Sequence, residues 1–288
     1  MKSLLKLLLI PVLFLSACNS QNLSSEEKIP LEVEATEEYE KEDKTIYRDS
    51  LKIAGEFYTP VNSKDIFPLA IISHGFAENM DKTRDIALSF VKAGIASFVF
   101  DYIGGHTSIK SDGKMTEMSV LTEAKDLNTI IDELKTYDNI DPDNIFLVGQ
   151  SQGGFVSTYC ACTRDDIKSL IAYYPAYCIR DDAIKQFDSV DKVPDTYTVM
   201  GFATIGKIYY VDAVSFDIYE LMKNYENNVL LFHGTADDIV PYEYAVRASE
   251  TFQNVEFITY QNAGHGFSGN DKIDSINRSI EFLKNNLC

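Results

Sequence analysis

The sequence predicts an α/β fold in which helices cover both faces of a mostly parallel central sheet. Short apolar runs, typical of buried strands, alternate along the chain with longer segments in which apolar residues recur at helical spacing. One of these strands, at residues 145–148, leads through a Gly-x-Ser-x-Gly turn straight into the helical segment 153–163. Alternation of this kind is typical of parallel sheets that bind their ligands at the carboxyl ends of the strands.

The expected elements follow one another in a regular order. An antiparallel pair at the sheet edge comes first, at residues 45–58, where polar and apolar residues alternate around Gly55. The buried strands are expected at residues 69–73, 96–100, 145–148, 170–174, 229–232 and 255–259. The helices are expected at residues 81–93, 119–136, 153–163, 242–252 and 273–285. In the second of these helices one face is apolar, which predicts that it packs on the sheet.

The Gly-x-Ser-x-Gly turn is the strongest functional signal in the sequence. Gly149 and Gly153 leave room for a tight turn that holds Ser151 in a strained backbone conformation and exposes its hydroxyl at the carboxyl edge of the sheet. The N–H of Gln152 then lies at the start of a helix, where it can stabilise an oxyanion. We therefore expect Ser151 to be a catalytic nucleophile.

A serine nucleophile needs a base that is itself oriented by an acid. Histidines that follow the serine are the candidates in a fold of this kind, which leaves His233 and His265. His233 ends an apolar strand and is expected to pack or hydrogen-bond in the core, whereas His265 lies between glycines in a loop and is expected to be the base. Asp237 and Asp238 both qualify as the acid by chemistry, and only one of them can fill the role.

A second oxyanion donor is expected after the apolar strand at residues 69–73. Gly75 permits close approach of the backbone there, and the N–H of Phe76 is available as the donor. His74 precedes the nucleophile in the chain, so we expect it to brace this loop rather than to act as a base.

Four motifs resemble, in their order along the chain, those of the α/β-hydrolase superfamily. They are His74-Gly75-Phe76, Gly149-Gln150-Ser151-Gln152-Gly153-Gly154, Gly234-Thr235-Ala236-Asp237 and Gly264-His265-Gly266-Phe267. Within the superfamily they are similar to the motifs of bacterial cinnamoyl and feruloyl esterases and of small dipeptidyl-peptidase-like hydrolases. The resemblance covers roughly residue 45 to the C-terminus and implies the α/β-hydrolase fold. It also implies Ser151 as nucleophile, Asp237 as acid and His265 as base, with the N–H groups of Phe76 and Gln152 as the oxyanion hole.

The sequence departs from the family pattern in two places. A loop after the strand at residues 96–100 contains Gly104-Gly105-His106 where those esterases have Gly-His-Gly, and Gln150 stands where histidine is commoner. Neither departure falls on a residue of the implied triad.

The stretch at residues 176–226 interrupts the alternation and is too long for an ordinary connection. Because it leaves the carboxyl edge of the sheet, we interpret it as a lid over the active site. The alternative is a surface insertion whose aromatic side chains merely pack on the body. As a lid, it would contribute Tyr197, Phe202 and Tyr209 to the substrate pocket.

The N-terminus resembles a bacterial lipoprotein signal peptide. Basic residues in the first six positions, a short apolar core at residues 7–15 and the sequence Leu15-Ser16-Ala17-Cys18 carry this resemblance. It implies that residues 1–17 are removed, that Cys18 is acylated and that the protein lies on the extracytoplasmic face of a bacterial membrane. The alternative is an ordinary signal peptide with an incidental cysteine. Residues 18–44 are strongly acidic, which predicts a disordered tether before a hydrolase domain at residues 45–288.

Composition excludes several classes of partner. The 288 residues carry a formal net charge of −18, which argues against nucleic acid and polyanionic substrates.

The cysteines lack the spacing of a zinc site, so we expect no metal and no cofactor. Cys160 and Cys162 are two apart on an expected helix and point away from each other, so they are not expected to pair. The sequence predicts no oligomeric state.

Taken together, the motifs predict a serine hydrolase that cleaves small-molecule carboxylic esters, of hydroxycinnamoyl or short acyl type, through an acyl-enzyme intermediate. One alternative is a dipeptidyl-peptidase-like serine peptidase, which would use the same triad. The other is a lipid-anchored binding protein without activity, against which the intact set of Ser151, Asp237 and His265 argues.

Overall fold

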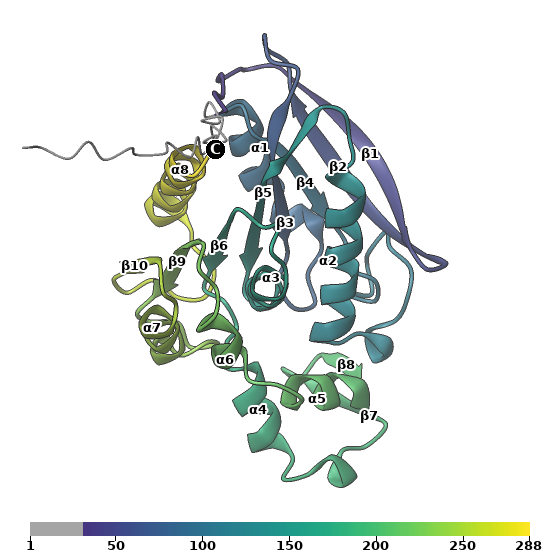
Figure 1. Cartoon of the computed structure of the whole chain (residues 1–288). Helices are drawn as coiled ribbons and strands as arrows, with labels where there is room; N and C mark the ends of the chain where they lie inside the picture. The colour runs from purple at the N-terminus through teal and green to yellow at the C-terminus, as the bar shows by residue number, and fades with distance from the viewer. Residues whose placement is uncertain (1–30) are drawn as a thin grey trace, which may run out of the picture.

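The centre of the fold is a twisted sheet, which has eight strands in the computed structural model that describes residues 31–288 (Figure 1). Its strand order is β1-β2-β4-β3-β5-β6-β9-β10. The strands are β1 Tyr39–Arg48, β2 Leu51–Pro60, β3 Phe67–Ser73, β4 Ala96–Phe100, β5 Ile140–Gln150, β6 Ser169–Tyr173, β9 Asn228–Gly234 and β10 Val255–Tyr260. Strands β1 and β2 pair antiparallel at one edge and β2 is antiparallel to β4, while the other pairs are parallel. The expected fold class is confirmed.

Helices cover both faces of this sheet because its inner strands are buried on both sides. Strands β3, β4 and β6 are buried along their whole length. Helices α1 (Arg84–Lys92) and α8 (Gly269–Asn285) pack on one face, and their side chains share an apolar cluster with that face. On the other face lie α2 (Val120–Leu134), α3 (Gln152–Thr163), α6 (Ile218–Met222) and α7 (Tyr242–Thr251).

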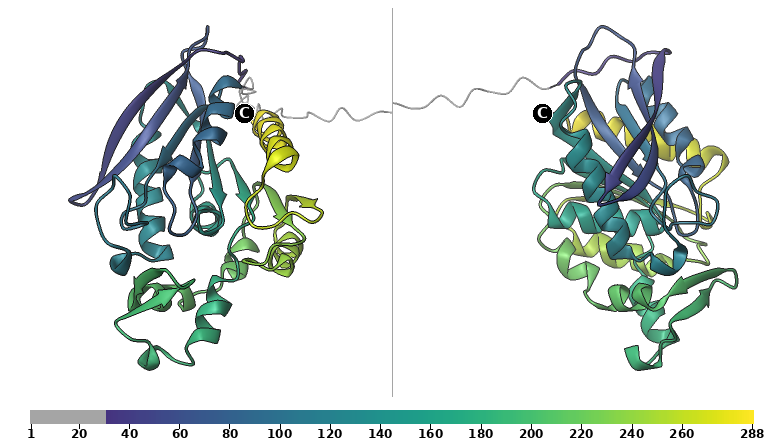
Figure 2. Two further views of the ribbon diagram at one scale, coloured as in Figure 1. Left: turned by 180° about the vertical axis from the view of Figure 1, so that it is seen from behind. Right: turned by 90° about the vertical axis from the view of Figure 1, so that its right-hand side faces the viewer.

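The expected lid, at residues 176–226, lies between β6 and β9. It consists of α4 (Ile179–Gln186), the 3-10 turn η3 (Val190–Lys192), the hairpin of β7 (Thr196–Val199) and β8 (Ala203–Gly206), and the helices α5 (Lys207–Val214) and α6. In both orientations of Figure 2 its outer part, α4 to α5, extends beyond the sheet as a separate layer. Met200 and Gly201 form the hairpin tip, and both have positive φ values, 52° and 77°.

The acidic segment before the sheet is more ordered than the predicted tether. Residues 39–44 belong to β1, where they pair with residues 55–60 of β2. The N–H of Leu31 donates to the carbonyl of Cys288, 2.9 Å away, and that of Thr36 to the carbonyl of Lys92, at 2.8 Å. Backbone pairing orders this edge strand while its charged side chains stay in water. The tether prediction is therefore wrong for residues 39–44, which form part of β1, and Cys18 lies outside the described residues.

Two further observations concern the described part of the chain. None of its helices has the length and apolarity needed to cross a membrane. Cys160, Cys162, Cys178 and Cys288 are all free thiols, so the expectation that Cys160 and Cys162 do not pair agrees with the structure.

Candidate active site

Ser151 sits in the strained turn between β5 and α3. Its φ of 51° and ψ of −120° lie in a region that residues with side chains rarely adopt. A Cβ atom on Gly149 would lie 2.3 Å from the carbonyl oxygen of Gly153, and a Cβ on Gly153 would lie 2.3 Å from that of His74. Both positions therefore require glycine, as the sequence pattern predicts.

The three residues predicted as a triad form one chain of hydrogen bonds. His265 Nε2 lies 2.9 Å from Ser151 Oγ, and His265 Nδ1 lies 2.8 Å from Asp237 Oδ2. His265 follows β10 and Asp237 follows β9, so the carboxyl ends of neighbouring parallel strands bring them together. With Nδ1–H donating to the carboxylate, Nε2 is free to accept the serine proton.

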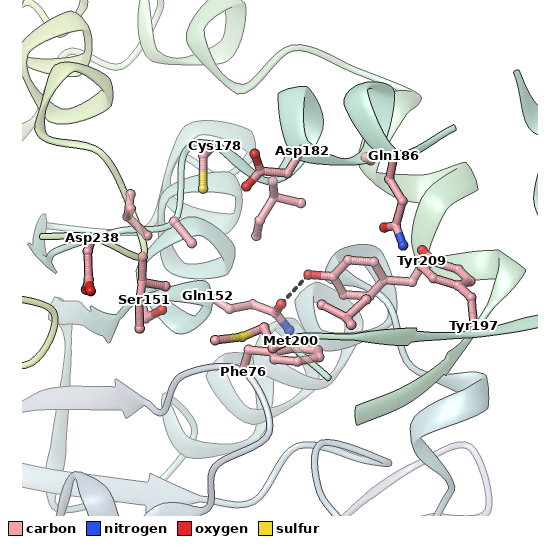
Figure 3. Close-up of a pocket in the computed structure, with 16 residues that line it drawn as sticks. Phe76, Ser151, Gln152, Cys178, Asp182, Gln186, Tyr197, Met200, Tyr209 and Asp238 are labelled. Atoms are coloured by element: carbon pink, nitrogen blue, oxygen red, sulfur yellow. Dashed lines mark hydrogen bonds between the residues drawn. The ribbon is translucent and has the colours of Figure 1, made fainter. Parts of the chain in front are cut away.

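The structure distinguishes the two adjacent aspartates. The side chain of Asp237 is fully buried, and its Oδ1 accepts hydrogen bonds from the N–H groups of Ile239 (3.0 Å) and Val240 (2.8 Å). Burial alone would raise the pKa of this carboxyl, but the hydrogen bonds from His265 and the two backbone N–H groups together hold it below its usual value. Asp238 is exposed and lies at the edge of a neighbouring cavity (Figure 3).

The two other buried histidines brace loops, as expected. His233 Nε2 lies 2.9 Å from the carbonyl oxygen of Val240, and burial lowers the pKa of His233, so its imidazole is neutral and donates from Nε2. His74 is 1% exposed, and its Nδ1 lies 2.8 Å from the carbonyl of Gly75 while its Nε2 accepts from the N–H of Tyr102 at 3.3 Å.

The loop after β3 approaches Ser151 closely. A Cβ on Gly75 would lie 3.3 Å from Ser151 Cβ, so the backbone of this loop passes close to Ser151. Glu78, which the sequence analysis missed, holds the loop by accepting a hydrogen bond from the N–H of Gly75 at 3.0 Å. Phe76 and Gln152 both line the cavity that reaches Ser151. Their placement is compatible with the predicted oxyanion hole.

Two cavities meet at Ser151. The acyl-side cavity, as we name the first, has a volume of about 430 Å³ and runs under the lid (Figure 3). Its lining residues are Phe76, Ser151, Gln152, Ala176, Cys178, Ile179, Asp182, Ala183, Gln186, Tyr197, Val199, Met200, Tyr209, Asp238, Ile239 and Val240. The second, the base-side cavity, has a volume of about 390 Å³ and is lined by His265, Glu78, Lys82, Tyr174 and Phe202 among others. Tyr197 and Tyr209 thus line the first cavity and Phe202 the second.

Two polar residues of the acyl-side cavity escaped the sequence analysis. Asp182 and Gln186 come from α4 and lie on the cavity side of that helix, together with Cys178 (Figure 3). The signal that could have found them is the spacing of four residues between successive positions, which places 178, 182 and 186 on one helical face.

Glu123 is a buried acid that the sequence analysis also missed. It lies on α2 and is 1% exposed, and it accepts a hydrogen bond from Gln152 Nε2 at 2.7 Å. Burial raises the pKa of Glu123 to about 8, so its carboxyl is neutral at pH 7. Among residues 31–288, no group of three or more His, Cys, Asp or Glu side chains is arranged to hold a metal ion.

Comparison with known proteins supports this description. Residues 83–288 match the sequence model of the prolyl oligopeptidase family. A curated relative, the mitochondrial palmitoyl-protein thioesterase ABHD10 of Bos taurus, is 27% identical over 215 residues, which cover 69% of this chain and 67% of the relative.

Solved structures agree with the fold. Est1E from Butyrivibrio proteoclasticus, with ferulic acid bound, is 25% identical with a TM-score of 0.77, covering 84% of this chain and 98% of that one. Mouse ABHD10 has a TM-score of 0.67 at 19% identity, covering 85% of this chain and 97% of its own. The α/β-hydrolase fold that the motifs implied is thereby confirmed.

Proposed function

The chain belongs to the prolyl oligopeptidase family and is a serine hydrolase of the α/β-hydrolase superfamily, and from the geometry of its site we propose that it cleaves carboxylic esters through an acyl-enzyme intermediate. The observation that carries the proposal is the continuous hydrogen-bonded chain from Ser151 through His265 to Asp237 beside two open cavities.

The chemistry follows from the positions of the three side chains. His265 Nε2 takes the proton of Ser151 as Oγ attacks the ester carbonyl carbon, and the charged Asp237 stabilises the imidazolium that forms. The N–H groups of Phe76 and Gln152 bind the oxyanion of the tetrahedral intermediate. The imidazolium then protonates the departing alcohol, and a water molecule repeats the sequence to release the acid and restore Ser151.

The two cavities support a placement of the two halves of the substrate. A leaving alcohol must stand next to the imidazole that protonates it, and His265 lines the base-side cavity, together with Lys82 and Phe202. The acyl group then occupies the acyl-side cavity under the lid.

The lining of the acyl-side cavity favours an aromatic acyl group with a polar end. The rings of Phe76, Tyr197 and Tyr209 line it, and the carboxylate of Asp182 and the amide of Gln186 can accept hydrogen bonds from a hydroxyl group there. The structure of Est1E with ferulic acid bound supports a hydroxycinnamoyl ester as the substrate class.

One observation favours a second candidate, a peptidase that recognises a free amino terminus. Asp182 and Asp238 both line the acyl-side cavity, whose lining residues include no lysine or arginine. A protonated amine would be attracted to this pair of carboxylates, and the family whose model matches is named for an oligopeptidase.

We also propose that the protein is anchored to the membrane by a lipid on Cys18 and takes its substrate from the surrounding water. The N–H of Leu31 donates to the carbonyl of Cys288, whose own N–H donates to Asn144 Oδ1, within β5 and seven residues before Ser151. An anchor joined there would hold the domain by the end of the sheet opposite the lid (Figure 1).

A panel of substrates tests the proposed activity. It should contain a methyl hydroxycinnamate, a short-chain acyl ester, a palmitoyl thioester and a dipeptide anilide, each assayed with the wild type and with Ser151→Ala. We expect the hydroxycinnamate ester to have the highest kcat/KM and Ser151→Ala to lower turnover at least a thousandfold with an unchanged melting temperature. Turnover of the anilide alone would favour the peptidase, and near-normal activity of Ser151→Ala would exclude the serine mechanism.

A further inference from the structure

The side chain of Gln152 is held from two directions inside the protein. It is buried, although Gln152 directly follows the nucleophile and lines the acyl-side cavity. Its Nε2 donates to Glu123 Oε2 at 2.7 Å, and its Oε1 accepts from the hydroxyl of Tyr209 at 2.5 Å (Figure 3). Because the backbone N–H of Gln152 is a proposed oxyanion donor, these two bonds orient the residue that carries it.

Tyr209 contacts the other proposed donor residue as well. Its ring meets that of Phe76 edge to face, with the ring centroids 5.9 Å apart and the ring planes at 66°. Tyr209 therefore touches Gln152 through its hydroxyl and Phe76 through its ring, and it lines the acyl-side cavity next to both.

The hydrogen bonds that link Tyr209, Gln152 and Glu123 all donate in one direction, from Tyr209 towards Glu123. The hydroxyl of Tyr209 is the donor, because Oε1 of Gln152 carries no hydrogen, and Gln152 in turn donates to Glu123. The carboxyl of Glu123 is neutral at pH 7, so these three hydrogen-bonded side chains are buried without burying a charge. Hydrogen bonds in such a chain polarise and strengthen one another.

The helix that carries Tyr209 is fixed to the body of the protein. Ser119, the N-cap of α2, donates its hydroxyl proton to Asp212 Oδ2 on α5, at 2.5 Å. Gly206, the N-cap of α5, lies so close to the backbone that a Cβ there would be 2.0 Å from the carbonyl oxygen of Thr116. Helix α5 is thus a firm support, whereas the hairpin tip of the lid exposes Met200 and Phe202.

We propose that Tyr209 is a positioning residue of the oxyanion hole, through which the lid helix α5 aligns the N–H donors of Gln152 and Phe76. The proposal rests on the esterase function proposed above for the same site. Since the ring of Tyr209 also lines the acyl-side cavity, an acyl group that fills the cavity presses on the same contacts. Esters whose acyl groups reach Tyr209 should therefore have a higher kcat than shorter esters, and not only a lower KM.

The test compares Tyr209→Phe with Tyr210→Phe. Tyr209→Phe keeps the ring on Phe76 and removes only the donor to Gln152. Tyr210 is the next residue of α5, and its hydroxyl bonds to the carbonyl of Phe187 at 3.1 Å, away from the site. Each variant loses one hydroxyl hydrogen bond, and the two residues lie on the same helix. Tyr210→Phe therefore controls for a loss of stability.

For Tyr209→Phe we expect kcat on a hydroxycinnamate ester to fall about tenfold, the equivalent of one hydrogen bond, while KM changes less than twofold. A trifluoromethyl ketone, which forms an oxyanion with Ser151, should bind about tenfold more weakly. The corresponding hydroxycinnamyl alcohol, which has neither a carbonyl nor a carboxylate group to place in the oxyanion hole, should bind as it does to the wild type. Tyr210→Phe should leave all of these values unchanged.

Three results would overturn the proposal. They are an unchanged kcat in Tyr209→Phe, an equal loss of affinity for the ketone and the alcohol, and the same loss in Tyr210→Phe. Failure of the proposed function is distinguishable, because the wild type would then not hydrolyse the ester through Ser151 at all.

A second variant keeps the test decisive if Tyr209→Phe folds poorly. Gln152→Met keeps the backbone N–H and removes the side-chain hydrogen bonds to Glu123 and Tyr209, together with the longer contact of Nε2 with Met118 Sδ at 3.8 Å. If Tyr209 acts through Gln152, Gln152→Met should show the same loss in kcat. Adding Tyr209→Phe to that variant should then lower kcat by less than a further twofold. Losses that multiply in the double variant would contradict the proposal.

Discussion

His233 Nε2 lies 3.4 Å from Asp237 Oδ2, the same carboxylate oxygen that accepts the hydrogen bond of His265. The stronger contact of His233 is with the carbonyl of Val240, at 2.9 Å, so this histidine closes the loop that holds the acid. The core histidine and the proposed base therefore both lie next to one oxygen of the Asp237 carboxylate.

His233→Phe should damage both stability and catalysis. It removes the donor to the carbonyl of Val240 and leaves that buried group unpaired, which costs about 1–3 kcal/mol in the free energy of unfolding. The loop should relax and misplace Asp237, so kcat should fall while KM stays similar. Urea unfolding and steady-state kinetics on the same samples measure both effects. Full activity together with the loss of stability would show that His233 stabilises the loop without positioning Asp237.

Asp237→Asn and Asp238→Asn should differ by orders of magnitude in rate. Loss of the charged acid leaves the imidazole of His265 without its stabilising partner and favours the wrong tautomer, a loss of about ten-thousandfold in a well-studied serine hydrolase triad. Asp238 is exposed and makes no contact with His265 among the hydrogen bonds of the described residues, so its substitution should change kcat only a few fold. The two variants need assays on one ester at one pH. Greater damage in Asp238→Asn would mean that the acid is misassigned.

Glu123 should make the protein less stable as the pH rises from about 5 to 8. Burial raises its pKa from the usual 4.5 to about 8 in the folded state. Below 4.5 both states hold the proton; between 4.5 and 8 the unfolded state loses it first and is favoured, and above 8 the cost is complete. That cost approaches about 5 kcal/mol at its upper limit. The neighbouring Asp126, whose pKa burial raises to about 6, adds a similar slope below pH 6.

Glu123→Gln isolates this effect, since the amide keeps an acceptor for Gln152 and cannot ionise. We expect its free energy of unfolding to exceed that of the wild type at pH 8 and the difference to shrink towards pH 5. Urea unfolding at four pH values measures it. Parallel curves for the two proteins would mean that Glu123 is already charged in the folded state.

Cys18→Ser should release the protein from the membrane fraction. Two acyl chains on Cys18 give stable anchoring, and the serine variant can carry none. Extraction with and without detergent, with mass spectrometry of the N-terminal peptide, measures the outcome. A wild type without lipid on Cys18 would leave an ordinary signal peptide as the better interpretation.

The sequence alone determined the features that depend on neighbouring residues. Gly149 and Gly153 flank Ser151 within one turn, where no side chain fits, so the strand, turn and helix follow from local sterics. The run of apolar strands and amphipathic helices likewise determined the parallel sheet, because each pattern has its own period.

The tertiary structure alone decided what depends on distant partners. Ser151 and His265 are 114 positions apart, and the geometry that separates Asp237 from Asp238 exists only when β9 and β10 lie side by side. Residues 39–44 form a strand because β2 offers them a backbone partner, which acidic composition does not reveal. Tyr209, Gln152 and Glu123 come from three helices, and no local period in the sequence relates a hydroxyl, an amide and a carboxyl that meet only after those helices have packed.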